Sequence, residues 1–239
     1  MKRVERAQRV LRELERRYKR DFRDNPGTAL AKVTVETDDP FRVLISTILS
    51  QRTRDEKTEE ASEQLFAKYD SPEALARAPL TAVTKLIRPV GFYRQKAAKI
   101  REVSRILLEK FGGKVPDAYE ELITLPQVGP KTANCVLVYG FGKPAIPVDV
   151  HVAVISRRLG FAPASADEEE VERRLRRIVP LASWLPLNEW FVRFGKEVCR
   201  TNFPRCGACR FTRFCSYYRR LPAAKKALLK NRPPIASTR

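Results

Sequence analysis

The sequence predicts an all-α protein, because apolar residues recur at helical spacing along most of it and no segment alternates in the manner of a β-strand. One apolar stripe consists of Phe41, Leu44, Ile45, Ile48 and Leu49, and another of Ile100, Val103, Ile106 and Leu107. Helix boundaries are also marked. Asp39–Pro40 and Ser71–Pro72 each offer an N-cap followed by proline at the first helical position, and Gly112–Gly113 predicts a helix end after Phe111.

The composition indicates a folded, strongly basic protein. Its 239 residues include 47 lysines and arginines against 28 aspartates and glutamates, which gives a net charge of +19 at pH 7. An excess of this size attracts a polyanionic partner such as nucleic acid. The hydrophobic share of 43% is enough for a packed core, so wholesale disorder is excluded.

No targeting segment and no membrane association are expected. The apolar runs fall short of the ~18 residues that a membrane span needs, and the charged residues 1–23 lack the apolar stretch of a secretory signal. We therefore expect a cytoplasmic, nucleoid-associated monomer without a signal or transit peptide. Thiols stay reduced in that compartment, so the five cysteines indicate a metal site or a reactive thiol rather than disulfides.

Both terminal segments are rich in charge. Residues 2–23 are expected to form one long helix whose charged side chains pair three and four positions apart, and a solvated face is favoured there over a binding surface. Residues 217–239 hold seven basic and no acidic residues, with Pro233–Pro234 among them. We expect a mobile basic tail that adds nonspecific attraction to phosphate, or one that only keeps the protein soluble.

Four cysteines lie close together in the pattern C-x6-C-x2-C-x5-C, namely Cys199, Cys206, Cys209 and Cys215. Zinc sites with four cysteines usually have two C-x2-C pairs, whereas this segment has one, so an iron–sulfur cluster is favoured over zinc or unliganded thiols. Cys135 stands apart and is expected to be a buried, small apolar residue. The arginines among the ligands are expected both to balance the charge of a cluster and to contact phosphate: Arg200, Arg205, Arg210 and Arg213.

Another motif is the run LPQVGPKTAN at residues 125–134, which forms a turn between two helical patterns and is followed by Val148–His151. Together these segments resemble the helix-hairpin-helix and Gly/Pro…Asp signature of the endonuclease III DNA glycosylases. The cysteine spacing is similar to the 4Fe-4S loop of this family and its adenine-glycosylase relatives. The resemblance extends from Phe41 to Tyr218, through Ile48–Gln51, Val90–Tyr93, Val115–Pro116 and Phe194–Gly195.

The resemblance implies two helical lobes flanking a DNA-binding cleft. Residues 33–143 would form a six-helix barrel that includes the helix-hairpin-helix, residues 1–32 and 144–216 an iron–sulfur lobe, and residues 217–239 the basic tail. It further implies a base excision repair DNA glycosylase with AP lyase activity, a 4Fe-4S cofactor, and as partner double-stranded DNA with damaged bases, above all oxidised or damaged pyrimidines, or abasic sites.

Lys131 and Asp149 are the expected catalytic residues. A free lysine is almost entirely protonated at pH 7. At a helix start, Lys131 lies against the positive end of the helix dipole, and desolvation beneath DNA also favours the neutral amine that attacks carbon. A carboxylate at Asp149 would stabilise the oxocarbenium-like sugar as the base departs. The structural alternatives are a surface salt-bridging lysine and an N-cap, and the second is compatible with catalysis.

The resemblance also places the residues that contact DNA. Phe92 falls at the position of a hydrophobic wedge, and Arg52, preceded by Gln51, falls where the family has a gap-filling glutamine. In the hairpin, Gln127 occupies a position usually held by glycine, and Pro130 replaces an arginine. We expect Gln127 to adopt a backbone conformation that suits a non-glycine residue. The expected DNA contacts are Gln51, Arg52, Phe92, Gln127, Gly129, Lys131, Arg200 and Arg205.

Two alternatives remain at this point. The first is a mismatch uracil or thymine DNA glycosylase on the same scaffold, and the second is an iron–sulfur DNA-binding protein without catalysis. His151 is interpreted as structural rather than as a general base, although it is the single histidine and lies two residues from Asp149.

Overall fold

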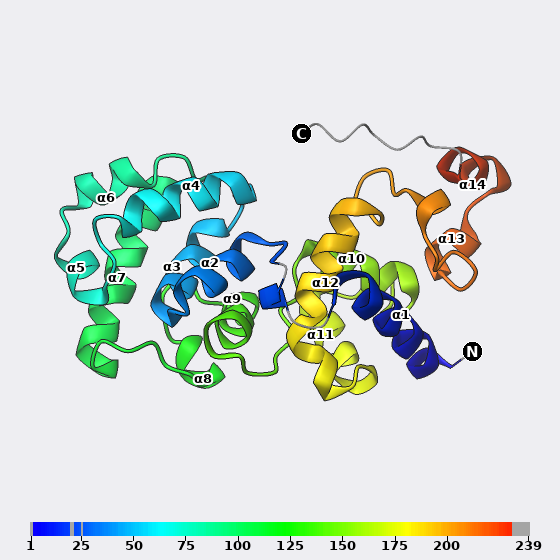
Figure 1. Ribbon diagram of the computed structural model, residues 1–239, viewed down its shortest axis with the longest axis horizontal. Helices are drawn as coiled ribbons and strands as arrows, with labels where there is room; N and C mark the ends of the chain where they lie inside the picture. Colours follow the sequence, from blue (N-terminus) through cyan, green and yellow to red (C-terminus); the bar gives the residue numbers. More distant parts are fainter. Residues whose placement is uncertain (1, 20–21, 25, 231–239) are drawn as a thin grey trace. The chain divides into compact units, whose positions relative to one another are not determined.

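The computed structural model describes residues 2–19, 22–24 and 26–230, and these residues form helices and connecting turns without a strand (Figure 1). The prediction of an all-α protein is confirmed. The chain divides into two compact units, one formed by Asp21–Pro147 and the other by Met1–Arg20 together with Val148–Arg239. Within the described ranges, no helix has both the length and the apolar character needed to span a membrane.

The unit Asp21–Pro147 is a succession of helices. In chain order they are a 3-10 turn (Phe22–Asp24), α2 (Ala29–Thr37), α3 (Pro40–Ser50), α4 (Asp55–Phe66), α5 (Pro72–Arg77), α6 (Leu80–Leu86), α7 (Tyr93–Phe111), α8 (Tyr119–Leu122), α9 (Pro130–Cys135) and a π-helical segment (Val136–Gly140). The predicted caps are present: Asp39 Oδ1 accepts from the Phe41 N–H at 2.8 Å, and Ser71 Oγ from the Ala74 N–H at 3.2 Å. Helix α7 ends at Gly112, whose φ of 58° is left-handed.

Helix α3 lies at the centre of this unit. Its apolar residues are buried on every side, and α2, α4, α7, α9 and the π-helical segment all contact it. Two buried hydroxyls on α3 are satisfied locally, since Ser46 Oγ lies 3.1 Å from Ser62 Oγ and Thr47 Oγ1 donates to the Val43 oxygen at 2.7 Å. A helix buried all round in this way holds its two ends at fixed positions for the loops that follow.

The helix-hairpin-helix consists of α8, the turn through residues 123–129, and α9. The Val128 N–H donates to the Leu125 oxygen at 3.1 Å and closes the turn, and Pro130 occupies the first position of α9, where a missing N–H costs nothing. Cys135 at the end of α9 is 1% exposed, which confirms the prediction of a buried small residue.

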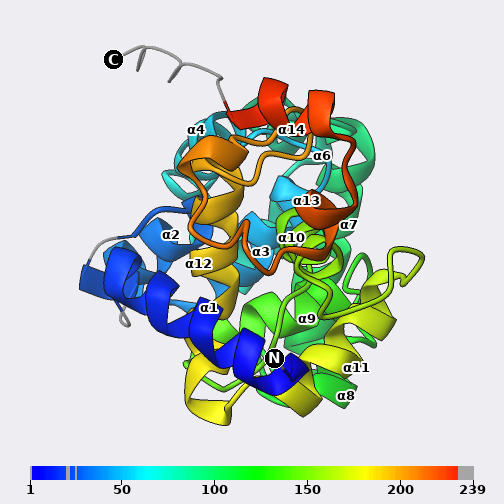
Figure 2. The same cartoon turned by 90° about the vertical axis from the view of Figure 1, so that its right-hand side faces the viewer.

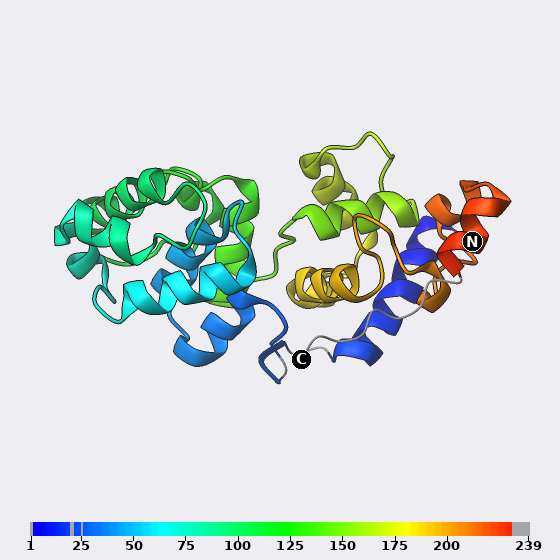
Figure 3. The ribbon, with the colours of Figure 1, turned by 90° about the horizontal axis from the view of Figure 1, so that it is seen from above.

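The second unit contains α1 (Arg3–Tyr18), α10 (Val150–Leu159), α11 (Glu168–Ile178), a 3-10 turn (Leu181–Ser183), α12 (Trp184–Glu197), a 3-10 turn (Cys206–Ala208), α13 (Ser216–Arg220) and α14 (Ala223–Lys230). Helix α1 packs against α12 along its apolar face (Figure 2). The helix predicted over residues 2–23 ends earlier, because Lys19 has a positive φ of 62° and its oxygen accepts from Trp190 Nε1 at 2.6 Å. Figure 3 shows α1 beside α12 from above.

The basic C-terminal segment is not a mobile tail over its described part. Residues 216–220 and 223–230 form α13 and α14, and Leu229 is 4% exposed. Helix α14 packs on the 3-10 turn Cys206–Ala208 of the cysteine segment. The alanines, lysines and leucines of α14 favour a helix, so an interpretation from charge alone missed it. Pro233–Pro234 and the rest of residues 231–239 lie outside the described residues.

Candidate active site and DNA-contacting loops

Lys131 is the second residue of α9. Gly129 caps the helix and Pro130 precedes the lysine, so Lys131 lies within the first turn, at the positive end of the helix dipole. Its side chain is half-buried, and no carboxylate of the described residues forms an ion pair with it. This differs from a salt-bridging surface lysine, the structural alternative for this position.

Three expected DNA-contacting loops meet in the unit Asp21–Pro147. The Gln51 side-chain amide donates to the Gln127 oxygen at 2.8 Å and to Thr132 Oγ1 at 3.3 Å, and so joins the end of α3 to the hairpin. The guanidinium carbon of Arg52 lies 5.8 Å from the centre of the Phe92 ring, a cation–π contact. The structure therefore pairs Arg52 with Phe92, and it joins the neighbouring Gln51 to Gln127 in the hairpin that bears Lys131.

Three of these residues have positive φ angles: 52° at Arg52, 56° at Phe92 and 64° at Gln127. A left-handed conformation costs a non-glycine residue about 1–2 kcal/mol. The expectation for Gln127 is therefore wrong: it adopts the conformation that glycine favours, because the turn requires it there. Strained backbone of this kind concentrates at functional sites, and Phe92 is also 56% exposed although its side chain is large and apolar.

Asp149 lies in the other unit and caps α10. Its Oδ1 accepts from the Val152 N–H at 2.8 Å, as the N-cap interpretation predicted. The carboxylate is half-exposed, and among the described residues no hydrogen bond engages Oδ2. The cap fixes the orientation of the carboxylate and leaves one oxygen available.

His151 follows in the first turn of α10 and packs against α12. A Cβ atom placed on Gly195 would lie 2.3 Å from Nδ1 of the His151 ring, so the ring rests directly on the glycine backbone. This nitrogen is buried, and none of the described residues forms a hydrogen bond with it. A ring held in this way is consistent with a structural role.

The four expected metal ligands border a common cavity. Cys199, Cys206, Cys209 and Cys215 line it together with apolar residues such as Phe194 and Val198. No group of three or more His, Cys, Asp or Glu side chains in the described ranges is placed to hold a metal ion. Burial raises the pKa of all four thiols, to about 11 at Cys206 and about 12 at Cys209. Without a cation these thiols are therefore protonated at neutral pH.

Arg158, which the sequence analysis missed, organises the segment between the first two cysteines. Its Nη1 donates to the Arg200 oxygen at 2.7 Å and lies 3.5 Å from Cys199 Sγ, and its Nη2 donates to the Thr201 oxygen at 2.7 Å. The residue lies on α10, far along the chain from the cysteines. No local pattern in the sequence could have indicated this contact.

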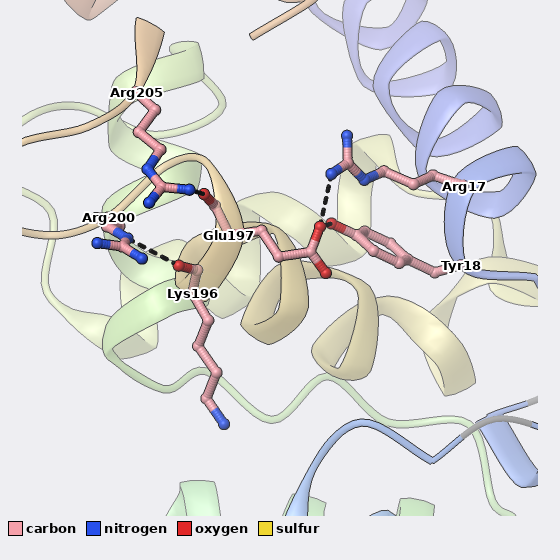
Figure 4. A network of polar contacts seen from close by, with 6 residues as sticks. All are labelled: Arg17, Tyr18, Lys196, Glu197, Arg200 and Arg205. Atoms are coloured by element: carbon pink, nitrogen blue, oxygen red, sulfur yellow. Dashed lines mark hydrogen bonds and ion pairs between the residues drawn. The ribbon is translucent and has the colours of Figure 1, made fainter. Parts of the chain in front are cut away.

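The arginines among the cysteines are partly engaged within the protein. Arg200 Nε donates to the Lys196 oxygen at 3.0 Å, and Arg205 Nη1 to the Glu197 oxygen at 3.4 Å, so both guanidinium groups turn back onto the end of α12 (Figure 4). Arg210 forms an ion pair with Glu13 at 3.0 Å. The contact with a cysteine sulfur is made instead by Arg158, whose Nη1 lies 3.5 Å from Cys199 Sγ.

Lys96 is a second residue that the sequence analysis missed. It is 5% exposed, and burial lowers its pKa to about 8. The sequence contains a signal for its burial, because Lys96 lies one helical turn before Ile100 on the apolar stripe that continues through Val103 and Leu107. A lysine on an apolar stripe is rarely buried without a specific partner.

The comparisons with known proteins decide the family. A family model described as HhH-GPD superfamily base excision DNA repair protein matches residues 45–181. The chain belongs to the HhH-GPD superfamily. Endonuclease III of Thermotoga maritima is 52% identical over 182 residues, which make up 76% of this chain and 85% of that protein. The predicted resemblance is confirmed.

Two solved structures share the fold of this chain. A trapped endonuclease III–DNA covalent intermediate is similar with a TM-score of 0.82 at 32% identity, over 92% of this chain and 98% of that one. A thermostable thymine-DNA glycosylase has a TM-score of 0.80 at 23% identity, over 91% and 98% of the two chains, and shows the fold alone. This HhH-GPD protein binds DNA and is a base excision repair DNA glycosylase and AP lyase.

Proposed function

We propose that this HhH-GPD enzyme removes oxidised or ring-damaged pyrimidines from duplex DNA, with Lys131 as the nucleophile and Asp149 as the stabilising carboxylate. The neutral amine of Lys131 attacks C1′ as the bond from C1′ to the base breaks, and the base leaves with a proton. Opening of the sugar ring gives a Schiff base. Loss of a C2′ proton then expels the 3′ phosphate by β-elimination, and hydrolysis frees the lysine.

The observation that carries this proposal is the environment of Lys131. The lysine lies in the first turn of α9, half-buried, without an ion pair to any described carboxylate. A carboxylate partner would hold the amine in an ion pair, whereas the Nζ of a lysine without such a partner can approach C1′ of the bound nucleotide. A nucleophilic lysine needs this combination.

Asp149 supports the departure of the base. Its Oδ1 accepts from the Val152 N–H, no described residue engages Oδ2, and the negative charge of the carboxylate can stabilise the positive charge that develops on the sugar. Because the cap holds the carboxylate in one orientation, little reorganisation is needed at the moment of reaction.

Phe92 and Arg52 would fill the space left by the everted nucleotide. The Phe92 ring is exposed and can stack on the neighbouring base pair, while the guanidinium of Arg52 can donate hydrogen bonds to the opposite base. Removing a nucleotide from the stack costs a few kcal/mol, which such contacts offset. The other guanidinium nitrogens of Arg200 and Arg205 have no partner among the described residues and can contact phosphate.

We also assign a 4Fe-4S cluster to the four cysteines that border the common cavity. Four thiol donors in a largely apolar enclosure suit an iron–sulfur cluster, and the nearby Arg158 guanidinium offsets part of its negative charge. When bound, the cluster would displace the thiol protons and hold the segment from Cys199 to Cys215 in shape. The residues of this segment would then present Arg200 and Arg205 to the phosphate backbone.

The decisive experiment is borohydride trapping on a duplex that carries one dihydrouracil. The Schiff base with Lys131 should be reduced to a stable protein–DNA adduct, and Lys131→Ala should abolish the adduct. Lys143→Ala, which removes a lysine that is ion-paired to Asp117 at 2.7 Å, is the matched control and should trap normally. An adduct that survives Lys131→Ala would assign the nucleophile to another residue.

Asp149 and the substrate class need their own tests. Asp149→Asn should reduce base release by about 10²-fold or more, since an oriented charge is lost. A panel of duplexes with dihydrouracil, a mismatched thymine or a mismatched uracil, each opposite guanine or adenine, separates the proposed substrates from mismatched bases. Faster release of mismatched thymine than of dihydrouracil would overturn the assigned lesion class.

A further inference from the structure

Lys96 forms a fully occupied hydrogen-bond centre inside the unit Asp21–Pro147. Its Nζ lies 2.8 Å from the Leu49 oxygen, 2.6 Å from the Gln51 oxygen and 3.1 Å from Thr53 Oγ1. An ammonium group has three protons, and each has an acceptor here. The charge is thus buried with all its donors satisfied, which is the condition under which a buried ammonium is tolerated.

The acceptors identify what this lysine does. Leu49 and Gln51 lie at the end of α3, where unpaired carbonyl groups and the helix dipole create negative charge. No basic residue lies in the last turn of α3 itself. Lys96 therefore supplies from α7 the cation that this helix end needs, and it fixes the backbone on both sides of Ser50.

Thr53 extends the contact to a second loop. Its hydroxyl accepts from Lys96 and from the Gly91 N–H at 3.1 Å, and it donates to the Gln51 oxygen at 3.2 Å. A Cβ atom on Gly91 would lie 3.0 Å from the Arg52 oxygen, so the two backbones are in direct contact at this point. The loops that carry Arg52 and Phe92 are thereby joined through one ammonium and one hydroxyl.

We propose that Lys96 is a positioning residue for DNA binding, which holds Arg52 and Phe92 in their left-handed conformations so that they enter the duplex as a pair. The proposal rests on the proposed function of these two side chains. Neither φ angle is favourable for an isolated residue, so each conformation persists only because contacts with the surrounding structure stabilise it. Lys96 does not touch DNA itself, because it is buried beneath both loops.

Lys96→Met tests the proposal, since methionine keeps the apolar stem and removes the three hydrogen bonds. On a dihydrouracil duplex under single-turnover conditions, we expect base release to fall about tenfold to a hundredfold, as for a displaced positioning group. Cleavage of a duplex with a preformed abasic site should fall less than about threefold, because no stacked base must be everted there. A 2-aminopurine beside the lesion should show a smaller fluorescence rise on binding.

Lys99→Met is the matched control. Lys99 lies one turn further along α7, where its half-buried side chain forms an ion pair with Glu102 at 2.8 Å. All three measurements should equal those of the unchanged enzyme in this variant. A Lys96→Met enzyme that releases dihydrouracil within about twofold of the unchanged rate would overturn the proposal.

Thr53→Val is a second test of the proposal, which can be used if Lys96→Met does not fold. This change keeps the side-chain shape and removes the hydroxyl that joins the two loops. We expect base release to fall about threefold to tenfold with abasic-site cleavage unchanged, and an equal loss in both reactions, or none, would overturn the proposal. Failure of the proposed function is recognised separately, because it would appear as an adduct that survives Lys131→Ala.

Discussion

The side-chain amide of Gln51 donates to the backbone oxygen of Gln127 at 2.8 Å, and this contact ties the end of α3 to the hairpin before Lys131. Gln51 is held on its other side by Lys96, which binds the Gln51 oxygen. The hairpin therefore depends on a residue more than seventy positions earlier in the chain. Its geometry is set by tertiary hydrogen bonds as much as by its own sequence.

The first prediction concerns the backbone of Gln127. Gln127→Gly should stabilise the protein by about 0.5–1 kcal/mol. The change relieves about 1–2 kcal/mol of left-handed strain, and it costs about 0.5–1 kcal/mol because glycine gives the unfolded chain more conformational entropy to lose on folding. The contact with Gln51 uses only the backbone oxygen and is retained. Urea unfolding measures the change.

Gln64→Gly is the matched control for this prediction. Gln64 is exposed within α4, where glycine costs about 1 kcal/mol relative to a good helix former. The same substitution should therefore have opposite signs at the two positions. A loss of stability in both variants would show that the Gln127 side chain contributes more than its strained backbone costs.

The second prediction concerns the contact between Gly195 and His151. Gly195→Ala should destabilise the protein by about 1–3 kcal/mol, because the added methyl group would overlap the imidazole ring. His151 lies two residues after the cap at Asp149, so base release should fall as well. Thermal unfolding and a single-turnover assay measure the two effects.

A double variant distinguishes this clash from other effects of alanine at position 195. In His151→Ala the ring is absent, so the further change Gly195→Ala should cost less than about 0.5 kcal/mol. The interaction energy from the double-mutant cycle should equal most of the single-variant loss. Additive losses would place the cause elsewhere on α12.

The third prediction concerns the guanidinium of Arg158. Arg158→Lys keeps the charge but cannot reach the oxygens of Arg200 and Thr201 together, so the segment after Cys199 should be destabilised by about 1–3 kcal/mol. Iron content per protein should fall, and limited proteolysis should cut this segment faster. Arg157→Lys is the control, because Arg157 contacts Ala166 and Glu168 instead. Equal iron content in both variants would contradict the assigned role.

Local patterns predicted the helices, and tertiary contacts decided the exceptions. Asp39, Ser71 and Gly112 mark boundaries by their own chemistry, so the sequence alone located those helix ends. The left-handed φ of Gln127 was not predictable, because it is stabilised by a partner that is distant in sequence. An interpretation from sequence assigns a non-glycine residue its intrinsic preference, and here the tertiary hydrogen bond outweighs that preference.

The candidate site divides in the same way. The types and spacing of Lys131, Asp149 and the cysteines carry chemistry that a sequence displays directly, and their roles stay predictions for the experiments above. Lys96 and Arg158 act through atoms of remote backbone, which no spacing rule records. The sequence nevertheless contains a signal for Lys96, because it is a charged residue on an apolar helical stripe. A charged residue at such a position indicates a specific buried partner.

The last prediction concerns the pH dependence of stability through Tyr18. Its hydroxyl is buried at the end of α1 and donates to Glu197 Oε2 at 2.8 Å, and burial together with the Glu197 carboxylate raises the pKa of Tyr18. The raised pKa means that the folded state keeps this proton when the unfolded chain, with a pKa near its usual value of about 10, releases it. The stabilisation is therefore complete below about pH 10 and is lost as the pH rises further.

Tyr18→Phe should lower the free energy of unfolding by about 1–2 kcal/mol at pH 7, because it removes a hydrogen bond to a charged acceptor. Between about pH 10 and pH 11, the stability of this variant should decline less steeply than that of the unchanged protein. The gap between the two curves must narrow in that interval, since only the unchanged protein has this proton to lose. Tyr69→Phe is the control, because the Tyr69 hydroxyl has no hydrogen-bond partner among the described residues. Urea unfolding of both variants and of the unchanged protein, at intervals from pH 7 to about pH 11, measures these effects. If the stability curves of Tyr18→Phe and the unchanged protein stay parallel throughout, the proton on Tyr18 does not couple to folding.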